Sequence, residues 1–378
     1  MMDSNLYKQG FEPPVLSPAK IITACEIITA CDEKYSLKNR LWQGCPTITR
    51  TPKGRLWGGW YSGGTREPHE DNYNLLVYSD DNGVTWSDPV LIIDSVPDIF
   101  LRAMDIQLWL DPFNKLWVFW TQTRDSSFKN ENGHNSAYTD DVFGTWAITT
   151  ADIDSDSPLW SEPVRISDGF LRCRPTVLNN GRWIVCAYDW LCDKFAYTIS
   201  DDNGQTWKRM YGAVKTYEGR CFDETMIVQR LDGSLWSLSR TNQGRLAQTF
   251  SFDNGDTWTP SGFSMFETPS SRFWIDRLKS GNLLMIHHYG FTGRSHMTAM
   301  LSDDDGYTWK YKLLLDERSG VSYPDAVEYP DGSVMIIYDR GRTTDKEILT
   351  AYITEEDIKA GRLVNEKSHL TKTISKAP

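Results

Sequence analysis

Residues 322–339 of the chain, SYPDAVEYPDGSVMIIYD, contain the unit from which the whole protein is predicted to be built. An apolar-rich segment runs into a turn at residues 330–332 (PDG), and a second apolar segment follows the turn. A proline–aspartate–glycine turn between two such segments predicts a β-hairpin. The same plan recurs five more times along the 378 residues. If the copies surround an axis, Tyr323 faces that axis.

A second pattern, S-x-D-x-G-x-T-W, repeats along the same chain. Four copies match it, and they are Ser79–Trp86, Ser200–Trp207, Ser251–Trp258 and Ser302–Trp309. The last three copies are 51 residues apart, and the gap of 121 residues before them leaves room for a degenerate copy that ends at Trp160. A sixth copy would follow Asp339, where the pattern is lost. Self-similarity at a fixed period indicates a repeat architecture.

Each copy of this pattern is predicted to be a structural turn. Its aspartate can accept hydrogen bonds from the turn amides, its glycine supplies a positive φ, and its tryptophan packs between neighbouring repeats. A calcium loop is the competing interpretation, but that loop needs an oxygen ligand five residues before its glycine. The four equivalent positions hold no usable ligand, since they are Tyr78, Ile199, Phe250 and Leu301.

A hairpin with a short turn precedes each copy of the S-x-D-x-G-x-T-W pattern, which we call a tryptophan box. The six turn residues are Gly54, Asn114, Gly181, Gly233, Gly281 and Gly332. Hairpins and boxes together give about four short strands in each unit of about 50 residues, which is typical of a propeller blade. We therefore predict an all-β fold, a six-bladed β-propeller with four antiparallel strands per blade, in a single domain over residues 1–378. Residues 1–40 are expected to add a strand to the last blade, and residues 355–360 are the only predicted helix.

Composition and charge exclude several classes of function. The net charge of −11 argues against nucleic acid as the main partner. No apolar run approaches the roughly 18 residues that cross a membrane, so membrane insertion is not expected. The first residues show no signal pattern, which leaves the compartment open, as the sequence also leaves the oligomeric state. The seven cysteines lack metal-ligand spacing and are expected to be free thiols, most of them buried.

The innermost strand of each blade lines the central funnel. The residues that face the funnel can therefore be found by counting along the chain from each turn residue. Nine residues before each turn residue stand Cys45, Asp105, Arg172, Glu224, Arg272 and Tyr323, with Arg174 as the alternative to Arg172. Seven residues after it stand Tyr61, Thr121, Tyr188, Arg240, His288 and Asp339. The scaffold repeats but these positions do not, which indicates an asymmetric polar pocket. The alternative is that arginines and carboxylates pair with each other and plug the channel.

Tyr323 and Glu224 suggest a particular chemistry for this pocket. Tyrosine is a poor nucleophile alone because its reference pKa is about 10. A neighbouring carboxylate can take its proton as a bond forms, and Glu224 occupies the equivalent register two blades earlier. A neutral nucleophile suits a substrate that carries a carboxylate at the reacting carbon, and arginines bind such a carboxylate bidentately.

At this point the chain resembles the sialidase (neuraminidase) superfamily over nearly its whole length. Residues 221–224 (CFDE), followed by residues 231–233 (LDG) and Arg240, resemble the segment with the glutamate and the second arginine. Arg294 resembles the third arginine, and the segment around Tyr323 resembles that of the nucleophile. Asp339 stands where the family commonly has glutamate. The resemblance implies an exo-acting retaining glycoside hydrolase that releases a terminal acidic sugar and needs no metal or organic cofactor.

The sequence departs from that family in blade one. Where sialidases have Arg-Ile-Pro, the chain has GCP at residues 44–46, so the first arginine of the carboxylate-binding triad is absent. Arg172, Arg174 or Arg272 could substitute for it; otherwise the substrate is not a standard sialic acid. The resemblance places the acid/base residue on the loop YSGGTREPHEDNYN (residues 61–74), where Asp71 is the first candidate and Glu67 the second.

Two other functions remain open at this stage. One is a hydrolase or lyase of another acidic sugar on the same scaffold, which the absent arginine favours. The other is a carbohydrate-binding propeller without catalysis, which would use the abundant Trp and Tyr side chains as binding platforms. The fold alone cannot choose among these functions.

Overall fold

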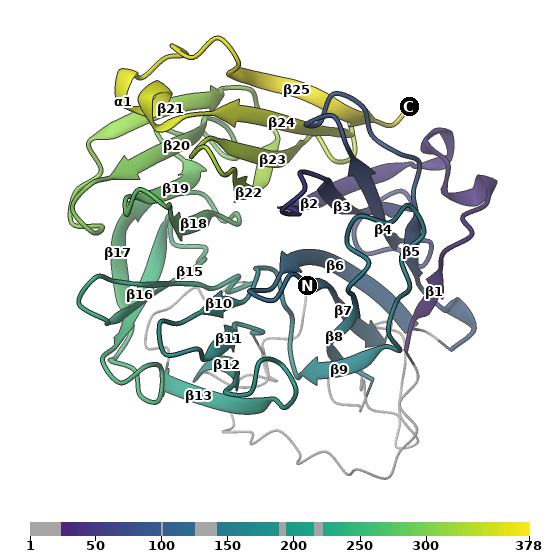
Figure 1. The fold of residues 1–378 in the computed structure, drawn as a ribbon, viewed down its shortest axis with the longest axis horizontal. Coiled ribbons are helices and arrows are strands. Elements are labelled where there is room, and N and C mark those ends of the chain that lie inside the picture. Colours follow the sequence, from purple (N-terminus) through teal and green to yellow (C-terminus); the bar gives the residue numbers. More distant parts are fainter. Residues whose placement is uncertain (1–23, 100, 125–141, 189–193, 215–221) are drawn as a thin grey trace.

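Six antiparallel sheets surround a central axis in the computed structural model of the chain (Figure 1). The structure describes residues 24–99, 101–124, 142–188, 194–214 and 222–378. The first strand of each repeat lies nearest the axis, and the following three strands pair outward from it in sequence order. This arrangement confirms the all-β, six-bladed propeller with four antiparallel strands per blade, to which blade one adds a fifth strand at its outer edge.

The first three blades take up the N-terminal half of the described chain. Blade one consists of β1 (Glu26–Ile28), β2 (Trp42–Arg50), β3 (Leu56–Gly63), β4 (Tyr73–Ser79) and β5 (Leu91–Asp94). Blade two consists of β6 (Leu101–Leu110), β7 (Leu116–Arg124), β8 (Gly144–Thr150) and β9 (Val164–Ser167). Blade three consists of β10 (Thr176–Val177), β11 (Trp183–Val185), β12 (Lys194–Ser200) and β13 (Lys208–Val214).

The other three blades complete the ring. Blade four consists of β14 (Met226–Gln229), β15 (Leu235–Ser239), β16 (Arg245–Ser251) and β17 (Gly262–Glu267). Blade five consists of β18 (Trp274–Arg277), β19 (Leu283–His288), β20 (Met297–Ser302) and β21 (Tyr311–Asp316). Blade six consists of β22 (Val321–Glu328), β23 (Val334–Arg340), β24 (Glu347–Ile353) and β25 (His369–Lys376). Within the described residues, the helical segments are 3-10 turns at Glu33–Tyr35, Leu37–Asn39 and Pro97–Ile99, and α1 (Glu355–Ala360), which lies where the sequence predicts it.

The N-terminal segment joins a different blade from the one expected. β1 pairs with β5 at the outer edge of blade one, where Glu26 lies opposite Asp94. Blade six takes its outer strand from its own C-terminal segment, because the chain returns after α1 as β25 and pairs with β24. The prediction that residues 1–40 complete the last blade is therefore wrong for the described part of that segment. Residues 1–23 lie outside the described residues, and the extent of the domain over the full chain stays a prediction.

Asp325 helps to close the ring between its first and last blades. It lies on β22 and is buried. Its Oδ2 accepts hydrogen bonds from Thr47 Oγ1 at 2.6 Å, from the Ile48 backbone N–H at 3.1 Å and from Gln107 Nε2 at 3.1 Å. One carboxylate thus ties the innermost strands of blades six, one and two together. Bonds to a charged acceptor are among the stronger hydrogen bonds, so the neighbouring inner strands are held in a fixed register.

The tryptophan boxes pack as the sequence predicts. Asp202 Oδ1 accepts from the Thr206 backbone N–H at 2.8 Å, which closes the turn. The Trp207 ring then lies between two blades, 6.2 Å from the ring centre of Trp117 and 6.3 Å from that of Trp183. Because Trp117 is on β7 and Trp183 on β11, the box tryptophan joins blades two and three through aromatic contacts. Its side chain is half-buried.

Bulges in the inner strands turn selected side chains toward the axis. The pairing of β2, β6 and β22 with their neighbours shifts register at Cys45, Asp105 and Tyr323. These three residues have φ angles of 55°, 56° and 54°, and Glu224 has 42°. All four are positions that the count from the turns selects. A bulge breaks the alternation of a strand and redirects a side chain, and positive φ at non-glycine residues clusters at functional sites.

In the described part of the chain no helix is long and apolar enough to cross a membrane.

Candidate active site

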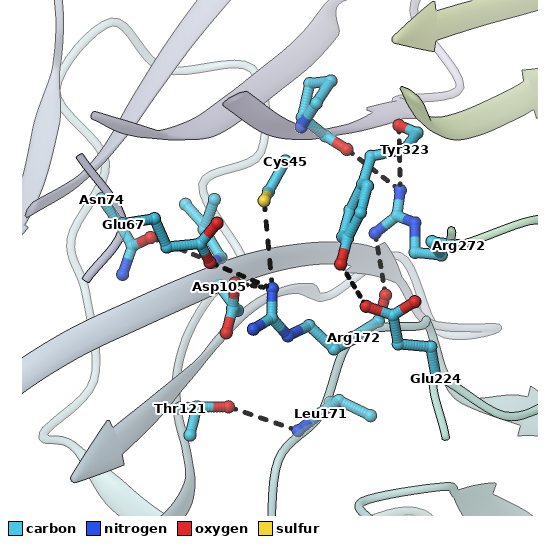
Figure 2. A network of polar contacts seen from close by, with 12 residues as sticks. Cys45, Glu67, Asn74, Asp105, Thr121, Leu171, Arg172, Glu224, Arg272 and Tyr323 are labelled. Atoms are coloured by element: carbon cyan, nitrogen blue, oxygen red, sulfur yellow. Dashed lines mark hydrogen bonds and ion pairs between the residues drawn. The ribbon is translucent and has the colours of Figure 1, made fainter. Parts of the chain in front are cut away.

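Three buried side chains from blades four and six form the centre of the candidate site. The Tyr323 hydroxyl donates a hydrogen bond to Glu224 Oε1, and Figure 2 shows the two groups facing one another. Arg240 Nη1 donates to Glu224 Oε2 at 2.9 Å and to the Tyr323 hydroxyl oxygen at 3.0 Å. Glu224 precedes β14, Arg240 follows β15 and Tyr323 lies within β22. The hairpin of blade four therefore presents a carboxylate and a cation together to the phenol of blade six.

Glu224, Arg240 and Tyr323 form a trio, and the charges around it determine whether Tyr323 or Glu224 carries the proton of their hydrogen bond. Burial, and next the negative Glu224, raise the pKa of the Tyr323 phenol well above its usual value. Burial also acts to raise the pKa of Glu224, but the charges of Arg240 and Arg172 outweigh it and lower that pKa below its usual value. At neutral pH the proton is on the phenol and the carboxylate is charged. The carboxylate is thus in the state that a base requires, and the phenol is its hydrogen-bond donor.

A second charged group lies beside the Tyr323 ring. Arg172 forms an ion pair with Asp105, and its Nη1 lies 3.5 Å from Glu67 Oε1 (Figure 2). Burial raises the pKa of Asp105 to about 7 although the positive Arg172 opposes the shift. The centre of the Arg172 guanidinium lies 6.0 Å from the centre of the Tyr323 ring. Arg172 therefore brings the Asp105 and Glu67 carboxylates next to the tyrosine.

Arg342 lies on the loop after β23 and contacts the other oxygen of the Glu67 carboxylate. Its Nε donates to Asp339 Oδ2 at 2.9 Å, and its Nη1 donates to Glu67 Oε2 at 3.1 Å. Its guanidinium lies 4.1 Å from the centre of the Tyr323 ring. Asp339 also accepts from Ser322 Oγ at 2.5 Å and from the Cys45 backbone N–H at 2.7 Å. Asp339 thus anchors Arg342 from within blade six.

Arg294 from blade five is also part of this group. Its Nη2 donates to the Ser270 backbone oxygen at 3.1 Å, and its guanidinium lies 5.6 Å from the centre of the Tyr323 ring. Arg240 Nε donates to Ser270 Oγ at 3.1 Å, so Ser270 links the two arginines. Three guanidinium groups, those of Arg240, Arg294 and Arg342, are therefore grouped around one tyrosine. Arg240 and Arg294 of this cluster are suited to a carboxylate or a similar anion.

Arg272 lies next to Tyr323 but is engaged with the backbone. Its Nη1 donates to the Arg172 carbonyl at 2.8 Å, and its Nη2 donates to the carbonyls of Pro46 at 3.1 Å and Pro324 at 2.8 Å (Figure 2). These carbonyls belong to three different blades. The contacts favour a role in holding the inner strands together over the predicted role in substrate binding.

Three other predicted site residues make their contacts away from the trio. Arg174 pairs with Asp276. His288 is buried and lies 2.8 Å through Nδ1 from the Ser295 backbone oxygen, and burial lowers its pKa to about 4. The Asp71 side chain is 66% exposed, and its carboxylate lies 3.5 Å from His69 Nδ1. Of the two acid/base candidates, Glu67 is therefore the one that contacts the charged groups beside Tyr323.

Sequence reasoning missed Arg342 altogether. The count along the hairpin selects one residue per strand end and stops at Asp339, three residues before Arg342. The absent arginine at residue 44 was the available signal, because a cation could then be sought in the neighbouring loops. Arg172, by contrast, occupies the position that the count selects.

One group of potential metal ligands in the described part of the chain consists of Cys45, Glu67 and Asp105. One potential ligand atom from each lies within 4.8 Å of the others. The two carboxylates already pair with Arg172, and Glu67 also pairs with Arg342. Burial raises the pKa of the Cys45 thiol, which opposes formation of the thiolate that binds metals. The donor set therefore suits an ion-pair network better than a metal ion.

Comparisons with known proteins agree with the fold. A family model described as a BNR repeat-like domain matches residues 54–336. The anhydrosialidase of Macrobdella decora is 28% identical over 222 residues, which cover 54% of the chain and 29% of that protein. The chain thus spans less than a third of the length of this curated relative.

Two solved structures illustrate the likeness of fold. The intramolecular trans-sialidase from Ruminococcus gnavus, in complex with oseltamivir carboxylate, has a TM-score of 0.67 at 17% identity, over 86% of the chain and 97% of that structure. The NanB sialidase from Streptococcus pneumoniae has a TM-score of 0.65 at 17% identity, over 96% of the chain and 71% of that structure. At these identities the likeness shows the fold.

Proposed function

The chain belongs to the BNR repeat-like domain family, and from this premise we propose that it is a sialidase-like, exo-acting retaining glycoside hydrolase for a terminal acidic sugar. The buried hydrogen bond from the Tyr323 hydroxyl to Glu224 is the observation that carries the proposal. A phenol that faces the funnel and donates to a charged carboxylate is a nucleophile with its base already in place.

The mechanism uses two displacements at the anomeric carbon. In the first, the Tyr323 oxygen attacks that carbon while its proton passes to Glu224, and the bond to the leaving oxygen breaks. An acid protonates the leaving oxygen, which departs as an alcohol. In the second, water attacks the same carbon and gives a proton to the group that acted as acid. As the water attacks, the bond to the Tyr323 oxygen breaks and that oxygen recovers its proton from Glu224, so the two inversions give overall retention.

Glu67 is proposed as the acid/base residue. Its side chain is 22% exposed, and its carboxylate contacts both Arg172 and Arg342, which lie beside Tyr323. Asp71, the first candidate from sequence, is 66% exposed and contacts His69. A general acid must be within hydrogen-bond reach of the leaving oxygen, and the contacts of Glu67 support this position better.

The substrate is proposed to carry a carboxylate next to the reacting carbon. Arg240 and Arg294 lie beside Tyr323, and a neutral phenol attacks a carbon beside a carboxylate without the repulsion that an anionic nucleophile would meet. Sialic acids are one such substrate class. Because residue 44 is glycine, other acidic sugars belong in the same panel of tests.

A second candidate activity differs only in what attacks the covalent intermediate. A curated relative is named anhydrosialidase, and a solved neighbour is titled an intramolecular trans-sialidase. In that activity a hydroxyl of the sugar itself would replace water in the second displacement. Mass spectrometry of the released sugar separates the two, since the anhydro product is lighter by one water.

Trapping of the covalent intermediate tests the proposal. A fluorinated acidic glycoside with a good leaving group slows the second displacement, and peptide mass spectrometry should then find the sugar on Tyr323. An adduct on a carboxylate would exclude Tyr323 as the nucleophile. Tight sugar binding without turnover on sialosides and uronic-acid glycosides would favour the non-catalytic binding propeller instead.

A further inference from the structure

The loop that carries Arg342 is held firmly to blade one. The Arg342 carbonyl accepts a hydrogen bond from the Gln43 backbone N–H at 3.3 Å, and the Gln43 side chain donates to the Lys346 carbonyl at 2.5 Å. Within the loop, the Lys346 backbone N–H donates to the Gly341 carbonyl at 2.6 Å. These contacts fix the point from which the Arg342 side chain extends toward the axis.

Each nitrogen of the Arg342 guanidinium contacts a different group. Nε donates to Asp339, and Nη1 donates to Glu67. Nη2 donates to Ser322 Oγ at 3.3 Å, next to Tyr323 in the chain, and the guanidinium lies 4.1 Å from the centre of the Tyr323 ring. One side chain therefore contacts both the nucleophile and the candidate acid.

Gly44 provides the space for this side chain. A Cβ atom at residue 44 would lie 2.7 Å from Cδ, 2.8 Å from Cγ and 2.8 Å from Nε of Arg342. Contacts below about 3.0 Å do not occur at real Cβ atoms, so any larger residue at this position would displace the Arg342 side chain. Gly44 does not have a positive φ, and the requirement for glycine is therefore one of space alone.

We propose that Arg342 is a positioning residue that holds the Glu67 acid and the Tyr323 nucleophile in their relative positions. The absence of a side chain at Gly44 leaves the space that Arg342 occupies. This inference rests on the proposed function. Glu67 lies on the loop between β3 and β4 rather than in a strand. Its other cationic contact, Arg172, is 3.5 Å away, against 3.1 Å for Arg342. Loss of Arg342 would leave the acid poorly aligned, and small misplacements of a catalytic group reduce rates strongly.

Substrates that differ in their need for an acid provide the test. The wild type and Arg342→Gln should be assayed on two glycosides of the same acidic sugar, one with a nitrophenol leaving group and one with an alkyl alcohol. Loss of general acid catalysis costs about 10²–10⁴-fold, so kcat/KM on the alkyl glycoside, which reports the first displacement, should fall by about that factor. The nitrophenyl glycoside barely needs protonation in that displacement, and its kcat/KM should fall by less than about tenfold. Arg342→Lys keeps the charge and should recover part of the loss.

Gly44→Ala is an independent way to disturb the same residue without removing its charge. It should give the same dependence on the leaving group as Arg342→Gln. Gly262→Ala is the matched control, because a Cβ there meets nothing within 4 Å, and it should leave both rates unchanged. Thermal unfolding of each variant establishes that it is folded.

Three results would overturn the inference. Equal losses on the two glycosides would mean that Arg342 acts through binding or folding and not through the acid. Wild-type rates in Arg342→Gln would mean that it has no positioning role. A wild type that forms no adduct on Tyr323 would remove the proposed function, and the inference with it, whereas a Tyr323 adduct together with equal losses would overturn the inference alone.

Discussion

Tyr323 donates its phenolic proton to a hydrogen bond with Glu224, although the two residues are 99 positions apart and belong to blades six and four. Both side chains are buried, and Arg240 contacts both. The proposed nucleophile and its base are therefore in contact before any substrate arrives. The energy needed to align them is provided by folding rather than by substrate binding.

Tyr323→Phe should abolish covalent catalysis and leave the fold intact. Only one hydroxyl is lost, so substrate binding should change little, whereas kcat should fall by several orders of magnitude. Steady-state kinetics on an acidic aryl glycoside, with thermal unfolding as the check on folding, measures both effects. Full activity in this variant would refute the assignment.

Glu224→Gln should reduce kcat by about 10²–10⁴-fold, the usual value of a positioned proton acceptor. The amide keeps the size of the side chain but cannot accept the proton from Tyr323. The loss should be similar for good and poor leaving groups, because both require attack by Tyr323. A loss confined to poor leaving groups would instead identify Glu224 as the acid.

Arg240→Ala should impair both stability and activity. It leaves the Glu224 charge buried and without its partner, which typically costs about 3–5 kcal/mol of the free energy of unfolding. It should also raise KM for an acidic glycoside or abolish turnover. The matched control is Arg245→Ala, because Arg245 is 43% exposed and pairs with Glu267 at the surface, where an ion pair contributes at most about 1 kcal/mol. Unchanged kinetics in Arg240→Ala would count against the anion site.

Trp207→Ala should destabilise the protein through the contact between blades two and three. Removal of a buried large aromatic side chain costs about 3–5 kcal/mol, and the half-buried Trp207 should lie at the lower end of that range. Denaturant unfolding measures the change, and Trp207→Phe should recover part of it. A change below about 0.5 kcal/mol would contradict the role of the box tryptophans.

Stability should decrease as the pH falls below about 6.5. Burial lowers the pKa of His288 to about 4 and that of His287 to about 3. A histidine in the unfolded chain has a pKa of about 6.5, so the unfolded state binds more protons between these values. Each histidine then lowers the free energy of unfolding by up to about 1.4 kcal/mol per pH unit as the pH falls through that range. Protonation of Asp105, whose pKa burial raises to about 7, acts in the opposite direction over the same range. Urea unfolding from pH 7 to pH 5 should therefore be compared between the two proteins, and His288→Gln should lose less stability than the wild type as the pH falls.

Local signals in the sequence determined the repeat, the number of blades and most of the axis positions. A box or a hairpin turn is formed by residues within a few positions of each other, so its pattern can be read from a short stretch. Because each turn fixes the register of its hairpin, a count from Gly332 finds Tyr323 and a count from Gly233 finds Glu224. The same count finds Cys45 and Asp105, which have the same bulged conformation.

Contacts between blades were decided only by the tertiary structure. β1 pairs with β5 of blade one, and no local pattern specifies that choice. Arg272 and Arg342 have the same side chain, yet one binds three backbone carbonyls and the other reaches Glu67. A guanidinium lies several bonds from its backbone, so its partner depends on the space and charge that other blades place around it. For Arg342 that space exists because residue 44, on a different blade, has no side chain.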